Sequence, residues 1–458
     1  MPLAVAKFGW QAAGYPVGSL PDTVKILVLT NLYPPHHAGT YDLRCPEVVE
    51  ALRLRGHEPR ILTSHHGLNT EQRDSEIERR LILNGVFGHP VAAGFREMLA
   101  LEQHNHGALR EALAEFQPNL VHVWSLHGLS KSLLTALRNT QLPTVFDVAD
   151  HWLARELRED PWLRWWNRPG TNLLRGSLEL SGQRKRFDAT TPTRVMQGLD
   201  RVPELFGPAS LVDRLPPGSV SACRFDRLYF CSEALKAVTE QAGFQVGHAE
   251  VIHPGISTQT FFGEVKPIGH PVKKLLVVTR LAEGSGVTTA LQALRQARDH
   301  GVKVTLSIYG RGESDYVSQV RSFVVQHQLP VEFLTVSDQN RDLAAVYRQH
   351  DALLYTPEWE EPFALTPLEA MASGLPVIGA KIGGGRDLLR HGENALTYTS
   401  GDALELASRI QELQLQPALR RQMAEMAQAE VSSNYHESGV IDRIESYLNL
   451  SLELWGQT

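Results

Sequence analysis

The feature that most constrains the fold is a repeated alternation of short branched-aliphatic runs with helical segments. The run at 24–30 (VKILVLT) shows no polar alternation, which is typical of a strand buried on both faces. Similar runs follow through the first half of the chain: PRILT at 59–63, NLVHVWS, LPTVFDVAD, FDRLYFCS and AEVI. Strands that alternate with helices predict parallel βαβ units and therefore an α/β fold.

A second series of such strands begins near residue 273, with KKLLVVTRL, VKVTLSIYG, PVEFLTVS, DALLYTP and LPVIGA. Between the two series, GEVKPIGHP at 263–271 has the glycine and proline content of a linker. A chain of 458 residues exceeds the roughly 250–300 residues at which a single hydrophobic core stops growing. We therefore predict two doubly wound Rossmann-like domains.

The predicted organisation has four parts. Residues 1–23 form an N-terminal extension, 24–265 the first domain and 272–432 the second. The helical segment 433–458 is expected to pack back on the first domain. An insertion at 153–222 interrupts the first domain with an aromatic cluster (DPWLRWWNRP) and a basic stretch (RGSLELSGQRKR). We interpret it as a helical insertion packed on the first sheet; the alternative is an acceptor-binding or membrane-touching surface.

Composition excludes several classes of protein. A net charge of -6 argues against nucleic acid as a partner, because no basic field is available to displace counterions. The three cysteines form neither a disulfide framework nor a C-x-x-C pair, which favours a reducing cytoplasm. No apolar run approaches the ~18 residues of a membrane span, and the first residues do not resemble a signal peptide. None of these features excludes peripheral contact with a membrane.

The most informative segment is PEWEEPFALTPLEAMASGLPVIG, which follows the predicted strand DALLYTP. Thr366 and Pro367 are predicted as N-cap and first helical residue, and Gly374 as the stop signal. The positive N-terminal end of this helix would face the edge of the sheet where ligands bind, and it suits a diphosphate. Glu361 and Glu369 lie eight positions apart; Glu369 could serve a ligand or, alternatively, complete a capping box with Thr366.

Together with several other segments, this motif resembles the large retaining glycosyltransferase family that includes sucrose-phosphate and trehalose synthases and many bacterial polysaccharide enzymes. The other matching pieces are YPPHHAG, LRLRGHEPRILT, VIHPGIST, TRL after the first strand of the second domain, and GGGRDLL. The resemblance runs from residue 25 to the end, apart from the insertion. It implies the GT-B fold, in which two Rossmann-like domains face a cleft.

The resemblance also implies roles for particular residues. Gly39 would let the N-terminal loop approach the donor phosphates, and Arg280 would pair with the diphosphate. Glu361 would lie near the transferred sugar, and Glu369 would bind the ribose hydroxyls. The donor pocket would further include glycines from the YGRGE loop and amides from the start of the helix: Gly310, Gly312, Phe363, Ala364, Leu365 and Thr366.

This sequence departs from the family pattern at several positions. The family usually has a lysine five residues after the arginine, where this chain has Ser285, so a charge-assisted contact is lost. The family often has a histidine where this chain has Ala149, and His151, two residues further on, is the candidate to replace it. Ala364 and Asp387 stand where glycine and glutamate are common.

The prediction is a retaining glycosyltransferase that moves a hexose from a nucleoside-diphosphate sugar to an acceptor hydroxyl, with Glu361, His151 and Arg280 as catalytic candidates. No metal or further cofactor is expected, since the histidine pairs lack metal-ligand spacing. The resemblance implies a glycan or lipid-linked acceptor in bacterial surface-polysaccharide or glycoconjugate assembly, at the cytoplasmic face of the membrane. The alternatives are a degenerate homologue that binds a nucleotide sugar or glycan as a partner subunit, and a sugar-nucleotide epimerase.

Overall fold

The computed structural model describes residues 23–36, 41–92, 94–140, 142–156, 160, 227–244, 246–312, 314–334 and 343–455. Contacts divide the chain into two compact units. The first consists of Met1–Cys231, Lys236–Ile252 and Ile441–Thr458, and the second of Ser232–Leu235 and His253–Val440. Each unit carries its own parallel sheet, so the predicted α/β class with two Rossmann-like domains is confirmed.

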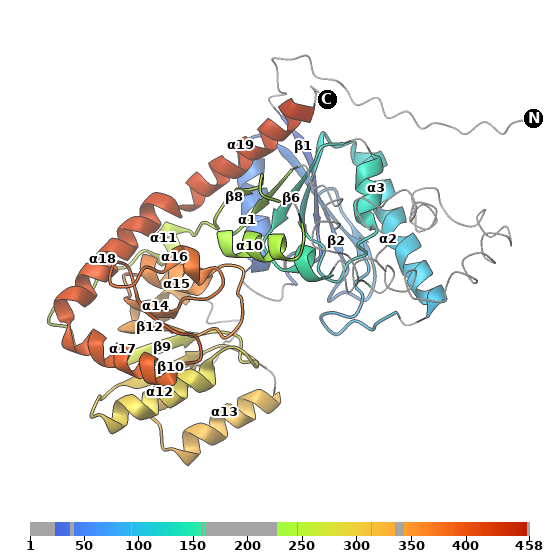
Figure 1. Ribbon diagram of the computed structural model, residues 1–458. Helices are drawn as coiled ribbons and strands as arrows, with labels where there is room; N and C mark the ends of the chain where they lie inside the picture. Colours follow the sequence, from blue (N-terminus) through green and yellow to red (C-terminus); the bar gives the residue numbers. More distant parts are fainter. Residues whose placement is uncertain are drawn as a thin grey trace, which may run out of the picture. The chain divides into compact units, whose positions relative to one another are not determined.

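The sheet of the first unit has eight strands in the order β3-β4-β2-β1-β5-β6-β7-β8 (Figure 1). All neighbours pair in parallel except β3 and β4, which are antiparallel. The strands are β1 Lys25–Thr30, β2 Glu58–Ser64, β3 Gln72–Arg73, β4 Ile77–Leu81, β5 Leu120–Ser125, β6 Thr144–Val148, β7 Leu228–Phe230 and β8 Glu250–Val251. The helices are α1 Tyr41–Leu54, α2 Phe95–Phe116, α3 Leu133–Asn139, the π-helix η1 Trp152–Glu156, and α10 Glu233–Gln241.

The second sheet is entirely parallel, in the order β11-β10-β9-β12-β13-β14. This is the strand order of a doubly wound Rossmann domain, with its reversal between β9 and β12. The strands are β9 Lys274–Val278, β10 Thr305–Tyr309, β11 Val331–Leu334, β12 Ala352–Tyr355, β13 Val377–Ala380 and β14 Leu396–Tyr398. The helices are α11 Thr258–Phe261, α12 Val287–Asp299, α13 Ser314–Gln326, α14 Leu343–Arg348, α15 Leu365–Ala372, α16 Gly385–Leu388, α17 Ala403–Leu415, α18 Pro417–Asn434 and α19 Glu437–Trp455.

Alternate residues of the second sheet face two different helical layers. Leu275 and Val277 of β9 join one hydrophobic core with residues of α12 and α17, such as Leu291 and Leu406. Leu276, between them, is equally buried but is not part of that core. Burial on both faces explains why the strands read as continuous aliphatic runs rather than as alternating ones.

The chain passes into the second unit earlier than the predicted linker. The segment from His253 onward packs with the second unit. Gly263 donates its N–H to the Ala372 carbonyl at 3.2 Å, and its own carbonyl accepts from Gln428 of α18 at 2.7 Å. At the other end of the chain, Tyr447 of α19 donates to the Leu228 carbonyl of β7 at 2.8 Å, within the first unit.

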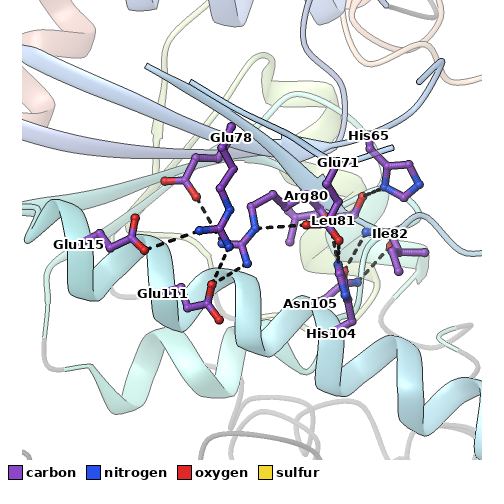
Figure 2. A network of polar contacts seen from close by, with 11 residues as sticks. His65, Glu71, Glu78, Arg80, Leu81, Ile82, His104, Asn105, Glu111 and Glu115 are labelled. Atoms are coloured by element: carbon purple, nitrogen blue, oxygen red, sulfur yellow. Dashed lines mark hydrogen bonds and ion pairs between the residues drawn. The ribbon is translucent and has the colours of Figure 1, made fainter. Parts of the chain in front are cut away.

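Strand β4 was not predicted, because its sequence IERRL is mostly charged. Its charges are nevertheless buried, and they are paired (Figure 2). Arg80 lies 2.7 Å from Glu111 of α2 and 3.4 Å from Glu78 of the same strand. Arg79 donates to the carbonyl oxygens of Tyr33, at 3.0 Å, and Pro34, so it holds the loop that follows β1.

Of the insertion predicted at 153–222, residues 157–159 and 161–222 lie outside the described part of the chain, and so does Gly39. The described beginning of the insertion is the π-helix η1, in which Trp152 and Leu153 are completely buried.

Candidate active site

Two loops of the second unit meet at the carboxyl ends of β9 and β12, where the strand order reverses. Gly286 lies at the N-cap of α12 with a φ of 69°, and a Cβ at this position would lie only 1.5 Å from the Thr356 carbonyl oxygen. The Thr356 hydroxyl donates to the Ser285 carbonyl at 3.2 Å. Only glycine permits this approach, so the loop after β9 is fixed against the loop after β12. Ligands of doubly wound sheets bind at this reversal point.

Arg280 follows β9 and has an exposed side chain at this edge. The predicted pocket glycines lie against the same segment: a Cβ on Gly310 would lie 1.8 Å from the Thr279 carbonyl oxygen, and one on Gly312 would lie 1.9 Å from that of Leu281. Both glycines are therefore required by backbone packing. They bring the loop after β10 against the residues that flank Arg280.

Ser285 occupies the position of the usual family lysine and is directed inward. Its side chain is 8% exposed. The hydroxyl lies 3.3 Å from the hydroxyl of Tyr316 on α13. A neutral pair of hydroxyls thus stands where the family pattern has an ammonium group.

Helix α15 begins two residues earlier than predicted. Ala364 is the N-cap, without a side-chain hydrogen bond, so the assignment of Thr366 as N-cap is wrong. The reason is that Leu365 already donates its N–H to the Phe363 carbonyl at 3.1 Å, which turns the chain before Thr366. Gly374 follows the last turn with a φ of 74°, at the predicted stop. The N-terminal amides of the helix and its positive dipole end lie directly after the loop from β12.

Glu369 is buried in the second turn of α15 and does not complete a capping box. Its Oε2 accepts a hydrogen bond of 2.7 Å from the hydroxyl of Tyr347, on α14. The same hydroxyl lies 3.4 Å from the Thr366 carbonyl oxygen. Burial raises the pKa of Tyr347, followed by the charge of Glu369, so this tyrosine remains a donor. No local pattern predicts Tyr347, since it lies 22 positions from Glu369.

Glu361 is the second carboxyl group held by a tyrosine. The hydroxyl of Tyr355, at the end of β12, donates to Glu361 Oε2. Burial raises the pKa of Glu361 to about 7, although the hydrogen bond from Tyr355 lowers it. The carboxyl group is therefore protonated more readily near neutral pH than an exposed glutamate.

The segment GGGRDLL packs against the loop that carries Glu361. Gly384 donates its N–H to the Glu361 carbonyl at 2.7 Å, and a Cβ on Gly384 would lie 2.4 Å from Phe363 Cα. Arg386 makes a bidentate pair with Glu360, at 2.8 and 3.1 Å. The glycines allow the close approach, and the ion pair fixes the residue next to Glu361.

Asp387, which replaces the common glutamate, belongs to the same segment, in α16. Its Oδ2 accepts the Glu233 N–H at 2.6 Å and lies 3.1 Å from His253 Nε2. The His253 ring in turn packs against the Phe363 ring, with centroids 5.5 Å apart. Asp387 thus positions His253, and the His253 ring packs against Phe363 directly before α15.

In the first unit, the predicted site residues follow β6. His151 comes directly before η1, after Ala149 and Asp150. Asp150 accepts from the Ser125 hydroxyl at 2.8 Å and from the Trp152 N–H at 2.7 Å. Burial raises the pKa of Asp150 to about 6, and the charge of Glu156 adds to that rise. The structure therefore brings His151 and Asp150 to the carboxyl edge of the first sheet.

A further histidine, which no sequence motif predicted, lies at the same edge. His127, after β5, bonds through Nδ1 to Glu156, whose other oxygen lies 2.9 Å from the buried ammonium group of Lys131. Burial alone would raise the pKa of Glu156, but the bond from His127 and the charge of Lys131 lower it to about 2. The bond to Glu156 raises the pKa of His127. Its position after a buried strand was the available sequence signal.

Two family models match the chain. The model described as "Glycosyl transferases group 1" matches residues 259–430, which include the whole site of the second unit. The model described as "Glycosyl transferase 4-like domain" matches residues 39–174. The chain therefore carries two glycosyltransferase domains of the kinds that these models describe. The matches extend over parts of both sheets, in agreement with the resemblance found in the motifs.

Curated relatives match the chain at modest identity. Glycogen synthase of Mycobacterium tuberculosis is 30% identical over 214 residues, which are 46% of this chain and 50% of the relative. Spore coat protein SA of Bacillus subtilis is 26% identical over 184 residues, 39% of this chain and 48% of the relative. The chain therefore spans about half the length of these curated relatives.

Solved structures share the fold of the chain over nearly its whole length. Sucrose-phosphate synthase from Thermosynechococcus elongatus superposes with a TM-score of 0.66 at 17% identity, covering 96% of this chain and 100% of that one. HepE of Anabaena, solved in complex with UDP and glucose, superposes with a TM-score of 0.61 at 18% identity, covering 93% and 99%. These neighbours have the GT-B fold, which the chain therefore shares.

The described residues contain neither a metal-binding cluster nor a candidate membrane-spanning helix. Among the described residues, no group of three or more histidine, cysteine, aspartate or glutamate side chains is arranged to hold a metal ion. Asp147, in β6, pairs with Arg44 at 3.4 Å. Within the same described ranges, no helix is both long enough and apolar enough to cross a membrane.

Proposed function

We propose that the chain transfers a sugar from a nucleoside-diphosphate donor to an acceptor hydroxyl, with retention of the anomeric configuration. The observation that carries this proposal is the pair of carboxyl groups at the start of α15, each bonded to a tyrosine hydroxyl: Glu361 to Tyr355 and Glu369 to Tyr347. Both lie beside the strand-order reversal, where a nucleotide is expected to bind.

The donor would be held mainly by the second unit. Arg280 and the amides of 363–366 would bind the diphosphate, because a helix N-terminus and a guanidinium group both favour negative charge. Glu369 would accept from the ribose hydroxyls, since a carboxylate offers about four acceptor sites and Tyr347 uses one. Glu361 would lie beside the transferred sugar. Gly310 and Gly312 would shape the donor pocket, and Ser285 would contribute at most a neutral hydrogen bond.

The first unit would bind the acceptor. Gly39 would let the loop after β1 approach the donor phosphates, and His151 would contact the transferred sugar. In a retaining reaction the acceptor hydroxyl attacks on the face from which the diphosphate leaves. Stabilisation of the leaving diphosphate by fixed dipoles and basic groups would supply the main catalytic effect. That HepE was solved with UDP and glucose supports a uridine nucleotide as the first donor to try.

The biological setting is proposed by family resemblance. The acceptor would be a glycan or a lipid-linked glycan in bacterial surface-polysaccharide or glycoconjugate assembly. The enzyme would act in the cytoplasm, at the inner face of the membrane as a peripheral protein, without a cofactor beyond its nucleotide-sugar substrate.

The test is transfer by the Glu361→Ala variant, with Glu332→Ala as the control. Glu332 is an exposed residue of β11, so its loss should leave activity unchanged. Glu361→Ala should reduce kcat by roughly 10²–10³-fold, the cost of removing one preorganised electrostatic group. Full activity in this variant would refute the assignment. NMR of the product's anomeric proton decides whether configuration is retained.

A second candidate is a degenerate homologue that binds a nucleotide sugar without turning it over. The inward serine at position 285, bonded to Tyr316, favours it because the usual positive charge is absent. Release of nucleoside diphosphate by the wild type in the presence of an acceptor would exclude this candidate. A Ser285→Lys variant that gains activity from an inactive wild type would support it.

A further inference from the structure

A cavity of about 530 Å³ lies outside the candidate donor site, in the second unit. It sits at the carboxyl ends of β13 and β14, beside the start of α16 and one face of α17. It is lined by Lys381, Ile382, Arg386, His391, Thr397, Tyr398, Thr399, Ser400, Glu405 and Arg409. Glu361, Glu369 and Arg280 are not among these residues, so the cavity needs an explanation of its own.

The lining favours an anion. Lys381 is exposed, and its ammonium group has no partner among the described residues. Glu405 is the one acidic residue of the lining, and it is already neutralised: it accepts the Thr399 N–H at 2.7 Å and pairs with Arg409 at 3.2 Å. Hydrogen bonds from Thr399, through its backbone N–H and then its side chain, followed by Arg409, hold the pKa of Glu405 below its ordinary value although burial raises it. The unbalanced charge of the cavity is therefore positive.

Hydrogen-bond donors accompany this charge. His391 Nδ1 accepts the Thr397 N–H at 3.0 Å, so the proton of its neutral ring is on Nε2 and is available to a ligand. Tyr398 is 3% exposed, and its hydroxyl has no partner among the described residues. Burial raises the pKa of Tyr398, so the hydroxyl stays protonated. A buried, unbonded hydroxyl costs stability and is most simply explained by a missing partner.

The cavity is connected to the loop that carries Glu361. Arg386 in its wall makes the bidentate pair with Glu360, the neighbour of Glu361. Ser400, also in the wall, donates to the Pro357 carbonyl at 2.7 Å. A ligand with negative charge would compete with Glu360 for the guanidinium group of Arg386. Binding in the cavity would then loosen the loop on which Glu361 depends.

We propose that this cavity is a second anion site, which takes the phosphate group of a phosphorylated small molecule and lowers the activity of the neighbouring active site. The phosphate would bind between Lys381, the Nε2–H of His391 and Arg386. The cavity volume accommodates a hexose phosphate as well as free phosphate. The effect on activity rests on the proposed transferase function, whereas the binding does not.

The binding experiment uses the full chain and isothermal titration calorimetry with inorganic phosphate and, separately, a hexose 6-phosphate. Tighter binding of the hexose phosphate would identify a phosphorylated sugar as the ligand; equal binding would mean that the site recognises the phosphate group alone, and would overturn a phosphorylated sugar as its specific ligand. Both titrations are repeated at saturating UDP, and binding should persist because the two sites are distinct. Loss of binding at saturating UDP would place the phosphate in the donor site and overturn the proposal.

Matched variants locate the site. Lys381→Glu should weaken binding at least tenfold, and Lys381→Arg should preserve it. Lys303→Glu makes the same charge change at an exposed lysine before β10 and should have no effect. Equal binding by wild type and Lys381→Glu would overturn the proposal.

An assay of sugar transfer distinguishes ligand binding in the cavity from its proposed effect on activity. The ligand should reduce sugar transfer severalfold in the wild type and in Lys303→Glu, and not in Lys381→Glu. Binding without any change in transfer would overturn the regulatory part alone. An inactive wild type would refute the proposed transferase function, while the calorimetric result would still decide whether the anion site exists.

Discussion

At the scale of single residues, the carboxyl group of Glu361 makes stability depend on pH. Its pKa rises from the ordinary value of 4.5 to about 7 in the folded chain. The folded state thus binds more protons than the unfolded state between these two values. By linkage, the contribution of this carboxyl group to the free energy of unfolding is largest below about pH 4.5. That contribution falls as the pH rises toward 7.

We therefore expect Glu361→Gln to remove this dependence and to stabilise the chain at pH 8, by about 1–3 kcal/mol, since each pKa unit corresponds to about 1.4 kcal/mol. The measurement is urea unfolding at pH 5 and pH 8, with exposed Glu332→Gln as the control. The difference between the Glu361 variant and the wild type should be larger at pH 8. An equal difference at both values would mean that the folded chain does not raise this pKa.

The motif predicted the two glutamates but not the groups that hold them. Glu361 and Glu369 belong to one continuous segment, so their spacing is visible in the sequence. Tyr355 lies at the end of the preceding strand, and Tyr347 comes from a helix packed against α15. Such contacts depend on how elements pack, which a linear pattern does not encode. For the same reason, Glu369 was equally compatible with a capping box.

At the scale of elements, hydrophobic runs predicted the central strands well and the charged strand β4 not at all. The runs are visible because both faces of a central parallel strand are buried. In β4, burial is achieved by ion pairs between Arg80, Glu78 and Glu111, and the partners come from the same strand and from α2 (Figure 2). Strand β14, only three residues long, was missed because its run is too short to stand out.

The pairing in β4 leads to a prediction. Arg80→Ala should destabilise the first unit by roughly 3 kcal/mol, because it leaves Glu78, whose side chain is 4% exposed, without its nearest partner. Arg73→Ala removes a neighbouring arginine that pairs with the same Glu111 at 2.7 Å but is 46% exposed. Exposed pairs contribute about 0–1 kcal/mol, so this control should unfold nearly as the wild type does. Equal destabilisation by both variants in guanidinium unfolding would contradict the structural role assigned to Arg80.

At the scale of the whole molecule, the chain has two units with separate sheets and separate cores. Units of this kind commonly unfold in separate steps, so a single melting temperature would not describe the chain. The site residues divide in the same way, with Glu361, Glu369 and Arg280 in the second unit and His151 in the first. A ligand held by one unit should therefore stabilise that unit selectively.

We expect differential scanning calorimetry to resolve two transitions, of which UDP raises one. A ligand present at one hundred times its Kd stabilises the state that binds it by about 2.7 kcal/mol, which for a unit of this size is a shift of roughly 5–10 °C. Arg280→Ala should reduce the shift, because the ligand would lose its charged partner, while the transition of the first unit should stay where it is. A panel of nucleoside diphosphates then identifies the base from the largest shift. If both transitions move together, the two units do not respond to the nucleotide separately; if neither moves with any nucleotide, the second unit does not hold the donor.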